Sequence, residues 1–364
     1  MSSGKQPNKQ PLNLHYHKRR RVLFSPKRRG GEPATAENLG VLTMESRRCL
    51  RTLAVYQAQK SQIPLPRSRC AAVLVALFVG RKGDLYVLLS RRSATLRAYA
   101  GDTSLPGGKV DPTDRTLEET ARREAFEEIG LPKDREKVPL LCILEPFLAG
   151  NQLIVTPVVV LILDNTLQPI LNRSEVTSLF SHPLASFISS IPPYPTEPEM
   201  VELEYHTYFD FDWDGPPMRI QNSKGETEMM QSRQVRMHRF MTGREAGGIK
   251  PVFGLTAAML IHTARLGFTR DPDFEVNSPT APTMEQRLAW ATIKEGSLIK
   301  RALLEDGTDV DWLKLKRLAG SVEENPDQIV RKAGEAADSL VRWKSIFWRS
   351  SESHRKGKIY KGKL

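Results

Sequence analysis

The chain has 364 residues, of which 40% are hydrophobic, and a formal net charge of +12 at pH 7. This length allows one large domain or two smaller ones with packed cores. No run approaches the roughly eighteen consecutive apolar residues of a membrane-spanning helix, so we expect no membrane insertion. Three cysteines without a CxxC pair favour neither a disulfide framework nor a zinc site, which fits a reducing compartment.

Much of the positive charge lies at the two ends of the chain. Nine Lys and Arg residues and no acid precede Glu32, and five more Lys and Arg follow His354. Residues 1–37 are polar, basic and poor in aromatic residues, which predicts a disordered tail. In the next segment, 38–66, we expect one amphipathic helix over residues 38–60, followed by a Pro-rich linker.

The middle of the chain predicts alternating strands and helices. Short runs of aliphatic residues between turn residues predict strands, and four-residue apolar spacing predicts helices. The expected elements are strands 70–79, 85–90, 138–144, 153–163, 205–211 and 233–239, and helices 117–129 and 254–266. Strands on both sides of the first helix and a late second helix indicate an α/β sandwich.

Residues 269–364 are more polar and predict a helical C-terminal extension that ends in a basic tail. The helices expected in this extension are 284–304, 311–319 and 328–348. No internal repeat is evident, and no motif in this extension indicates a function.

The helix expected at 117–129 has clear signals at both ends. Thr116 followed by Glu119 fits a capping box, and Gly130 followed by Pro132 fits a helix end. Its buried stripe is expected to consist of four apolar residues at four-residue spacing: Leu117, Ala121, Ala125 and Ile129.

The same helix carries an acidic cluster. Glu124, Glu127 and Glu128 fall on one helical face, where like charges destabilise a helix unless a cation lies among them. A hard cation such as Mg²⁺ prefers oxygen ligands. Just upstream, the glycines Gly107 and Gly108 let the backbone approach a metal ion or a phosphate. The alternative is an acidic solvent-facing surface balanced by neighbouring arginines.

Segment 108–131 resembles the Nudix box, whose pattern is Gly, five residues, Glu, seven residues, Arg-Glu, an apolar residue, any residue, Glu-Glu, any residue, Gly and an apolar residue. The second half matches at every fixed position, through Arg123, Glu124, Glu127, Glu128 and Gly130. In the first half Asp114 replaces the usual Glu, and the gap to Arg123 is one residue longer, which weakens any role for Asp114. The resemblance implies a Nudix hydrolase domain over residues 67–268, an α/β/α sandwich with a mixed sheet that hydrolyses a diphosphate.

The same resemblance implies roles for individual residues. Mg²⁺ or Mn²⁺ would be bound by Glu124, Glu127, Glu128 and the carbonyl of Gly108. Arg123 would orient the carboxylates by ion pairing, and the general base would be Glu127 or Glu124. Outside the box, Glu175 occupies the place of a short acidic motif of the family, which makes it a further candidate for the metal site.

Segment 88–108 resembles the motif that precedes the box in coenzyme A diphosphatases, those of the peroxisomal, fungal-like type included. The motif positions that fall in register are Arg92, Ser93, Arg97, Gly101, Leu105 and Pro106. Ser90 replaces Thr and keeps the hydroxyl, and the stretch 111–114, with its extra residue, also resembles this subfamily. The resemblance implies substrate binding by Arg92, Ser93, Arg97, Gly107 and Gly108.

The substrate expected from this second motif is coenzyme A or acyl-CoA, cut to 3′,5′-ADP and 4′-phosphopantetheine. Coenzyme A carries a 3′-phosphate besides its diphosphate, and arginine suits bidentate phosphate contacts. One alternative is a Nudix hydrolase of an oxidised nucleotide or NADH. Another is a nucleic-acid-binding or regulatory module that uses the basic tails. Because every glutamate of the metal helix is present, we expect no nucleic-acid partner.

The sequence indicates no oligomeric state and only weakly indicates a compartment. The terminal Gly362-Lys363-Leu364 resembles a peroxisomal Ser-Lys-Leu signal, although Gly is a poor first residue. We therefore expect the peroxisome. The acid-free basic N-terminus leaves a mitochondrial presequence or a nuclear signal as alternatives.

Overall fold

The computed structural model describes residues 42–321, apart from 165, 195–203, 222–226 and 243–250. The chain divides into two units, 1–319 and 320–364, and every element named below belongs to the first. The predicted tail at 1–37 and the predicted helix at 328–348 lie outside the described residues.

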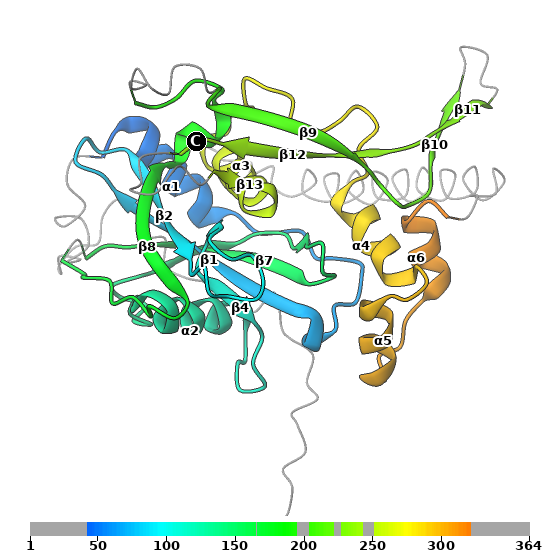
Figure 1. Cartoon of the computed structure of the whole chain (residues 1–364), viewed down its shortest axis with the longest axis horizontal. Helices are drawn as coiled ribbons and strands as arrows, with labels where there is room; N and C mark the ends of the chain where they lie inside the picture. Colours follow the sequence, from blue (N-terminus) through cyan, green and yellow to red (C-terminus); the bar gives the residue numbers. More distant parts are fainter. Residues whose placement is uncertain (1–41, 165, 195–203, 222–226, 243–250, 322–364) are drawn as a thin grey trace, which may run out of the picture. The chain divides into compact units, whose positions relative to one another are not determined.

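The described elements are drawn in Figure 1. The helices are α1 (Met44–Val55), α2 (Leu117–Ile129), α3 (Gly254–Phe268), α4 (Met284–Ile293), α5 (Leu298–Glu305) and α6 (Trp312–Leu318), with short 3-10 helices at η2 (Arg67–Arg69) and η3 (Leu184–Ile188). The strands are β1 (Cys70–Val79), β2 (Leu85–Arg92), β3 (Thr103–Ser104), β4 (Gly107–Lys109), β5 (Leu140–Ile143), β6 (Phe147–Leu148), β7 (Ile154–Leu161), β8 (Val176–Pro183), β9 (His206–Asp212), β10 (Met218–Gln221), β11 (Thr227–Gln231), β12 (Gln234–Phe240) and β13 (Val252–Phe253).

The main sheet is mixed and is organised around β1. Strand β7 pairs with β1 in parallel, whereas β2 and β4 both pair with it antiparallel. The central order is β3-β2-β1-β7-β5, and β8 continues the sheet beside β2. Every residue of β7 is buried. That burial explains why Val, Ile and Leu predominate in it, since a strand covered on both faces has no solvent side.

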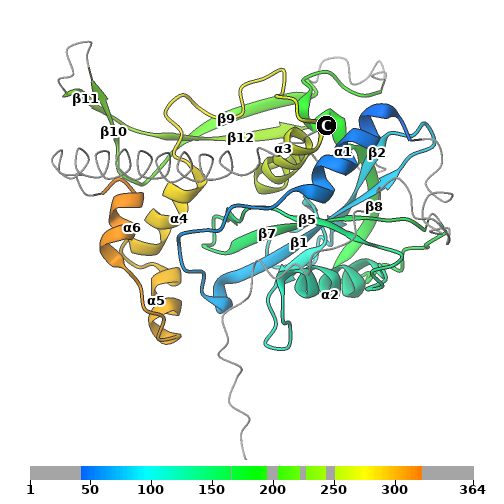
Figure 2. The same cartoon turned by 180° about the vertical axis from the view of Figure 1, so that it is seen from behind.

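Alternation along β1 divides the core between two layers. Ala71, Val75 and Leu77 belong to one buried cluster, which also contains residues of α1 and α3. Cys70 and Ala72, with other residues of the opposite parity, belong to a second cluster together with the apolar stripe of α2. Successive strand residues point to opposite faces, so α2 covers one face and α1 and α3 cover the other (Figures 1 and 2). This arrangement confirms the predicted α/β/α sandwich with a mixed sheet.

Most predicted elements are present, with shifted ends. Strand 70–79 and helix 117–129 have the predicted bounds, while the helix expected at 38–60 is described from Met44 and ends at Val55. The single helix expected at 284–304 is wrong. It is interrupted between α4 and α5, where Gly296 has φ +70, a backbone conformation that favours glycine. The strand β8 and the short strands β3, β4, β6, β10, β11 and β13 were not predicted, because their sequences lack a period-two apolar pattern long enough to detect.

The predicted C-terminal extension packs against the sandwich. Apolar residues of α4, α5 and α6 form a third buried cluster with Ile63, from the segment before β1, and with Ile154, the first residue of β7. Arg233 also donates hydrogen bonds to the carbonyls of Thr280 and Ala281, at 3.0 and 3.1 Å, which links the region after α3 to the sheet β13-β12-β9. These helices are therefore held by burial against the strand core.

A polar cluster ties α1, α3 and the end of β5 together. Glu145 accepts hydrogen bonds from the hydroxyl of Tyr56 and, at 3.1 Å, from Nε2 of His262. Burial alone would raise the pKa of Glu145, but these hydrogen bonds outweigh it and lower the pKa from 4.5 to about 2. The ionised carboxylate therefore stabilises the folded state.

We expect Glu145→Gln to lower the free energy of unfolding at pH 7 by about 1–2 kcal/mol, because Gln cannot form the charge-assisted bonds. The folded-state pKa lies below the unfolded value. The stabilisation is thus complete above about pH 4.5 and disappears as the pH falls toward 2. Urea denaturation of both proteins from pH 7 to pH 3 measures the difference, with exposed Glu305→Gln as the control. A constant difference across this range would contradict the assigned role.

Candidate active site on helix α2

The local sequence positions α2 tightly. The Thr116 side chain accepts a hydrogen bond from the backbone N–H of Glu119 at 3.1 Å, as the predicted capping box requires. The Glu119 carboxylate, however, accepts from the N–H of Arg115 rather than from that of Thr116. At the other end Gly130 has φ +69 and donates to the carbonyls of Ala125 and Phe126. The four predicted stripe residues are each at most 1% exposed, so the position of the acidic face is set by burial of the opposite one.

Two of the three glutamates lie against the glycine strand β4. The backbone N–H of Gly107 donates to Oε2 of Glu128 at 3.1 Å. A Cβ atom added at Gly108 would lie 2.5 Å from Cδ of Glu124, so a glycine is required for this approach. Gly108 itself pairs with Ala72 of β1. The antiparallel pairing of β4 with β1 thus carries both glycines to the carboxylates.

Arg123 connects the remaining charges of the helix. Its Nη1 lies 2.9 Å from Oε1 of Glu124 and 3.0 Å from Oε2 of Glu127. Its Nη2 donates to the carbonyl of Lys109 at 3.0 Å. Hydrogen bonds to Asp114 raise the pKa of Arg123 further above its usual range. The guanidinium therefore stays charged and holds two carboxylates beside the glycine strand.

Asp114 has a larger structural role than its departure from the family pattern predicts. It is 7% exposed and accepts two hydrogen bonds from Arg123, at 3.1 and 3.0 Å. The hydroxyl of Thr120 and the N–H of Asp111 donate to its Oδ2, each at 2.9 Å. Burial opposes ionisation, but these donors lower the pKa of Asp114. Although Asp has a shorter side chain than the Glu of the family pattern and the gap to Arg123 is one residue longer, Asp114 contacts Arg123.

Burial penalises the charged forms of two glutamates, Glu124 and Glu128, in the protein alone. Glu128 is 6% exposed, and burial raises its pKa to about 7, with smaller contributions from the charges of Glu124 and Glu175. The N–H of Gly107 and the charge of Arg92 oppose this shift only in part. Burial also raises the pKa of Glu124. A cation bound here would remove this penalty.

The predicted substrate-binding arginines occupy different environments. Arg92 ends β2, and its Nε is buried without a hydrogen-bond partner in the part of the chain that the structure describes. Ser93 is buried and structural: its N–H donates to the carbonyl of Glu175 at 2.7 Å, and its hydroxyl bonds that of Thr95. Arg97 is exposed on the loop that follows. The charge of Arg92 acts on Glu128, so Arg92 lies near the acidic cluster.

Glu175 lies on a loop that covers the C-terminal end of α2. The N–H groups of Ile170 and Asn172 donate to the carbonyls of Ile129 and Glu128, at 3.0 and 2.9 Å. These bonds satisfy carbonyls that a helix end leaves without intrahelical partners. They also bring the charge of Glu175 close enough to raise the pKa of both Glu124 and Glu128. From the sequence, only its position after Asn172 indicated this proximity.

Comparison with known proteins agrees with this geometry. The NUDIX domain model matches residues 68–208. An uncharacterized Nudix hydrolase, NudL, from Pectobacterium atrosepticum is 39% identical over 156 residues, which cover 43% of this chain and 78% of that protein. The chain belongs to the Nudix hydrolase family.

Two other Nudix relatives are similar to this chain. The first matches over a longer part of it, and the second has a more specific name. Nudix hydrolase 15, mitochondrial, of Arabidopsis thaliana is 35% identical over 211 residues, covering 57% of this chain and 62% of the relative. Peroxisomal coenzyme A diphosphatase 1 of Saccharomyces cerevisiae is 37% identical over 185 residues, covering 42% of this chain and 54% of the relative. The chain thus spans roughly three fifths of the length of these two relatives.

The Nudix helix fits a hard divalent cation by its donor chemistry. Carboxylate and carbonyl oxygens are available from Glu124, Glu128 and Gly108, and the charged forms of both glutamates are penalised by burial. No group of three or more His, Cys, Asp or Glu side chains among the described residues is already arranged to hold a metal ion. Arg123 instead contacts the oxygens of Glu124 and Glu127. Each ion pair engages one oxygen of the carboxylate, Oε1 of Glu124 and Oε2 of Glu127.

Proposed function

We propose that this Nudix hydrolase cuts the diphosphate bond of coenzyme A or acyl-CoA, releasing 3′,5′-ADP and 4′-phosphopantetheine, with Mg²⁺ or Mn²⁺ as cofactor. The observation that carries the proposal is the position of Arg92. Its buried Nε lacks a described partner, and its charge acts on Glu128. A phosphate-bearing substrate at the acidic cluster would supply the missing acceptor.

The proposed site residues divide into three tasks. Glu124, Glu128 and the carbonyl of Gly108 would hold the divalent ions, with Glu127 as a further ligand. When bound, these ions neutralise phosphate oxygens and lower the pKa of a water. Arg123 would orient the carboxylates through its ion pairs with Glu124 and Glu127. Glu127, about half exposed, or Glu124 would accept the proton of the attacking water.

Two arginines would each contact one phosphate-bearing part of the substrate. Arg92, beside the metal helix, would contact the diphosphate, and exposed Arg97 would contact the 3′-phosphate. Backbone groups of Gly107 and Gly108 would border the diphosphate, while buried Ser93 would hold the loop through Glu175 and Thr95. These roles follow from the resemblance of segment 88–108 to the coenzyme A diphosphatase motif, and the similar protein of Saccharomyces cerevisiae is named a peroxisomal coenzyme A diphosphatase.

The direct test is mass spectrometry of the products after incubation with coenzyme A and Mg²⁺ or Mn²⁺. We expect 3′,5′-ADP and 4′-phosphopantetheine, and no turnover in the presence of EDTA. NADH and an oxidised nucleotide tested in parallel represent the other Nudix substrates. Faster hydrolysis of either one than of coenzyme A would replace the substrate assignment and leave the reaction type intact.

The assignment of Arg97 is tested by comparing coenzyme A with dephospho-coenzyme A, which lacks the 3′-phosphate. We expect Arg97→Gln to lower kcat/KM for coenzyme A about tenfold or more, because a charge-assisted hydrogen bond contributes roughly 1.5–3 kcal/mol. The same variant should leave dephospho-coenzyme A nearly unchanged. Exposed Arg115→Gln is the control. Equal losses on both substrates would remove the 3′-phosphate contact.

We also propose a peroxisomal location, with the mitochondrion as the alternative. Relatives at moderate identity are named as peroxisomal in Saccharomyces cerevisiae and Mus musculus and as mitochondrial in Arabidopsis thaliana. In the part of the chain that the structure describes, no helix has both the length and the hydropathy that crossing a membrane requires. Microscopy of the tagged full chain against markers for both compartments tests the location.

A further inference from the structure

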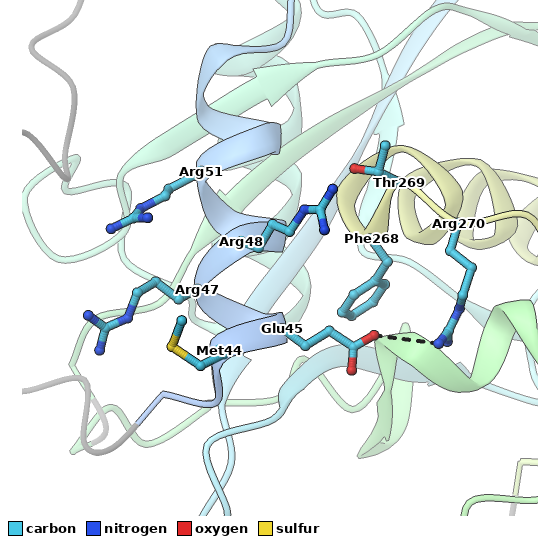
Figure 3. A pocket seen from close by; sticks show the side chains of 8 residues that line it. All are labelled: Met44, Glu45, Arg47, Arg48, Arg51, Phe268, Thr269 and Arg270. Carbon is cyan, nitrogen blue, oxygen red and sulfur yellow. Dashed lines mark ion pairs between the residues drawn. The ribbon is translucent and has the colours of Figure 1, made fainter.

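An open groove of about 680 Å³ lies on the face of the sandwich opposite the Nudix helix. It is bordered by the first turns of α1 and by the end of α3 (Figure 3). These two helices share a buried cluster with Ala71, Val75 and Leu77 of β1, whereas α2 packs on the other face of that strand. The groove is therefore separated from the proposed active site by the main sheet.

Arginines dominate the charge of this groove. Arg47, Arg48 and Arg51 line it from α1, and Arg270 lines it from the residues that follow α3. The single acid among the lining residues is Glu45, whose Oε1 lies 3.5 Å from Nη1 of Arg270. No ion pair of the three α1 arginines is found with any described residue. The groove thus has an excess of three positive charges over its lining acid.

This arrangement is unfavourable for an isolated helix. Arg47 and Arg51 are four residues apart, and like charges at that spacing repel each other. Arg47 completes the first turn of α1, where the helix dipole disfavours cations. A multiply charged anion bound in the groove would relieve both costs, since arginine forms bidentate contacts with phosphate.

The helices that border the groove are held firmly in place. Cys49 and Leu53 of α1 are fully buried, and a Cβ atom added at Gly267 of α3 would lie 2.5 Å from Sγ of Cys49. This close packing fixes α1 on α3. Thr269, with φ +54, ends α3 at the edge of the groove. The arginines therefore project from a rigid support, which limits the entropy that ligand binding would cost.

The arginines extend in two directions. Figure 3 shows Arg48 directed from α1 toward Thr269 at the end of α3, while Arg47 and Arg51 extend to the other side of α1. A ligand that contacts both sides needs two separated anionic groups. We propose that this groove binds a small molecule that carries two separated phosphate groups, independently of the diphosphate hydrolysed at α2.

The site is tested by isothermal titration calorimetry of the full-length protein in EDTA, which suppresses metal-dependent binding at α2. The probes are fructose 1,6-bisphosphate and adenosine 3′,5′-bisphosphate, with inorganic phosphate as the single-phosphate comparison. We expect at least one bisphosphate to bind with Kd below about 1 mM and at least tenfold more tightly than phosphate. Failure of both bisphosphates to bind at this level would overturn the proposal.

Two sets of variants locate the bound probe. Arg48→Gln with Arg51→Gln should weaken binding tenfold or more, whereas Lys314→Gln with Lys316→Gln, the same charge change on exposed positions of α6, should not. Glu45→Gln should tighten binding two- to threefold, because it removes the acid paired with Arg270. An improvement in affinity cannot result from a loss of folding. Unchanged affinity in both the arginine and the Glu45 variants would overturn the site.

A lipid headgroup offers similar phosphate chemistry. Sedimentation with vesicles of phosphatidylcholine, with and without phosphatidic acid, separates this source from a soluble ligand. We expect no difference in pelleting between the wild type and the α1 arginine variant. Pelleting that requires Arg48 and Arg51, in a protein that binds neither bisphosphate, would assign the groove to a membrane surface and overturn the soluble-ligand proposal.

Discussion

Glu128→Gln should lower kcat/KM for coenzyme A by about a thousandfold or more while raising the stability of the metal-free protein. The expected loss rests on the proposed role of Glu128 as an oxygen ligand of a divalent ion, which would stabilise transition-state charge by several kcal/mol. The gain follows from burial, because the Glu128 carboxylate is 6% exposed and its pKa is raised from 4.5 to about 7. A neutral Gln avoids the cost of that buried charge.

The pH dependence of this stability gain has a definite sign. The folded-state pKa of Glu128 lies above the unfolded value, so below about pH 4.5 both states are protonated and the gain is absent. It grows as the pH rises toward 7 and reaches up to about 3 kcal/mol above that pH. Thermal unfolding in EDTA at pH 4.5 and pH 8 measures it. In Mg²⁺ the order should reverse, since only the wild type binds the ion well.

Exposed Glu136→Gln serves as the control for Glu128→Gln. It changes the same charge close to the Nudix domain core without touching the acidic cluster, so activity and stability should both stay near wild-type values. Normal turnover by Glu128→Gln would remove the metal-helix mechanism. An equal Tm for wild type and variant at both pH values would instead show that the buried charge has no energetic cost.

Gly108→Ala should lower kcat/KM about a hundredfold with little change in the free energy of unfolding. The new Cβ would lie 2.5 Å from Cδ of Glu124 and would displace a carboxylate that is proposed to hold metal. The displaced group is the end of a flexible side chain, so the fold can accommodate it. A small displacement of a catalytic group is nevertheless sufficient to reduce the rate by this amount.

The neighbouring glycine provides a contrast. A Cβ at Gly107 would lie 2.3 Å from the carbonyl oxygen of Ala72 and 2.6 Å from Cα of Val73, both backbone atoms of β1. Gly107→Ala should therefore destabilise the protein by several kcal/mol. Gly150→Ala, where the new atom meets nothing within 4 Å, is the neutral control. Denaturation midpoints and kcat/KM for the three variants separate the effects. If Gly108→Ala retains full activity, Glu124 does not need its observed position.

How well the sequence predicts the proposed site depends on how far apart along the chain the contacting residues lie. Thr116, Gly130 and the apolar stripe act within one helix, so their spacing was sufficient to predict α2 and its acidic face. Arg123 and Glu127 are also four residues apart, within reach of each other on the helix. Local periodicity carries this information because helix geometry is the same in every context.

The contacts of Asp114 and Glu175 are harder to predict from the sequence, because their partners are distant along the chain. The departure of Asp114 from the family pattern predicts a weak role, yet its carboxylate accepts two hydrogen bonds from Arg123. Glu175 reaches the cluster only because the preceding loop bonds to the end of α2. Neither relation has a fixed spacing along the chain.

Local periodicity and a short motif were sufficient to predict the Nudix family, strand β1, helix α2 and the residue types of the proposed metal site. Three other features follow only from the folded chain: β4 lies against Glu124 and Glu128, the Nε of Arg92 is buried while Arg97 is exposed, and α1 and α3 form an arginine-lined groove on the opposite face. The pairing of strands and the packing of helices join segments far apart in the chain, and these long-range contacts set the burial and hence the electrostatic environment of each charge.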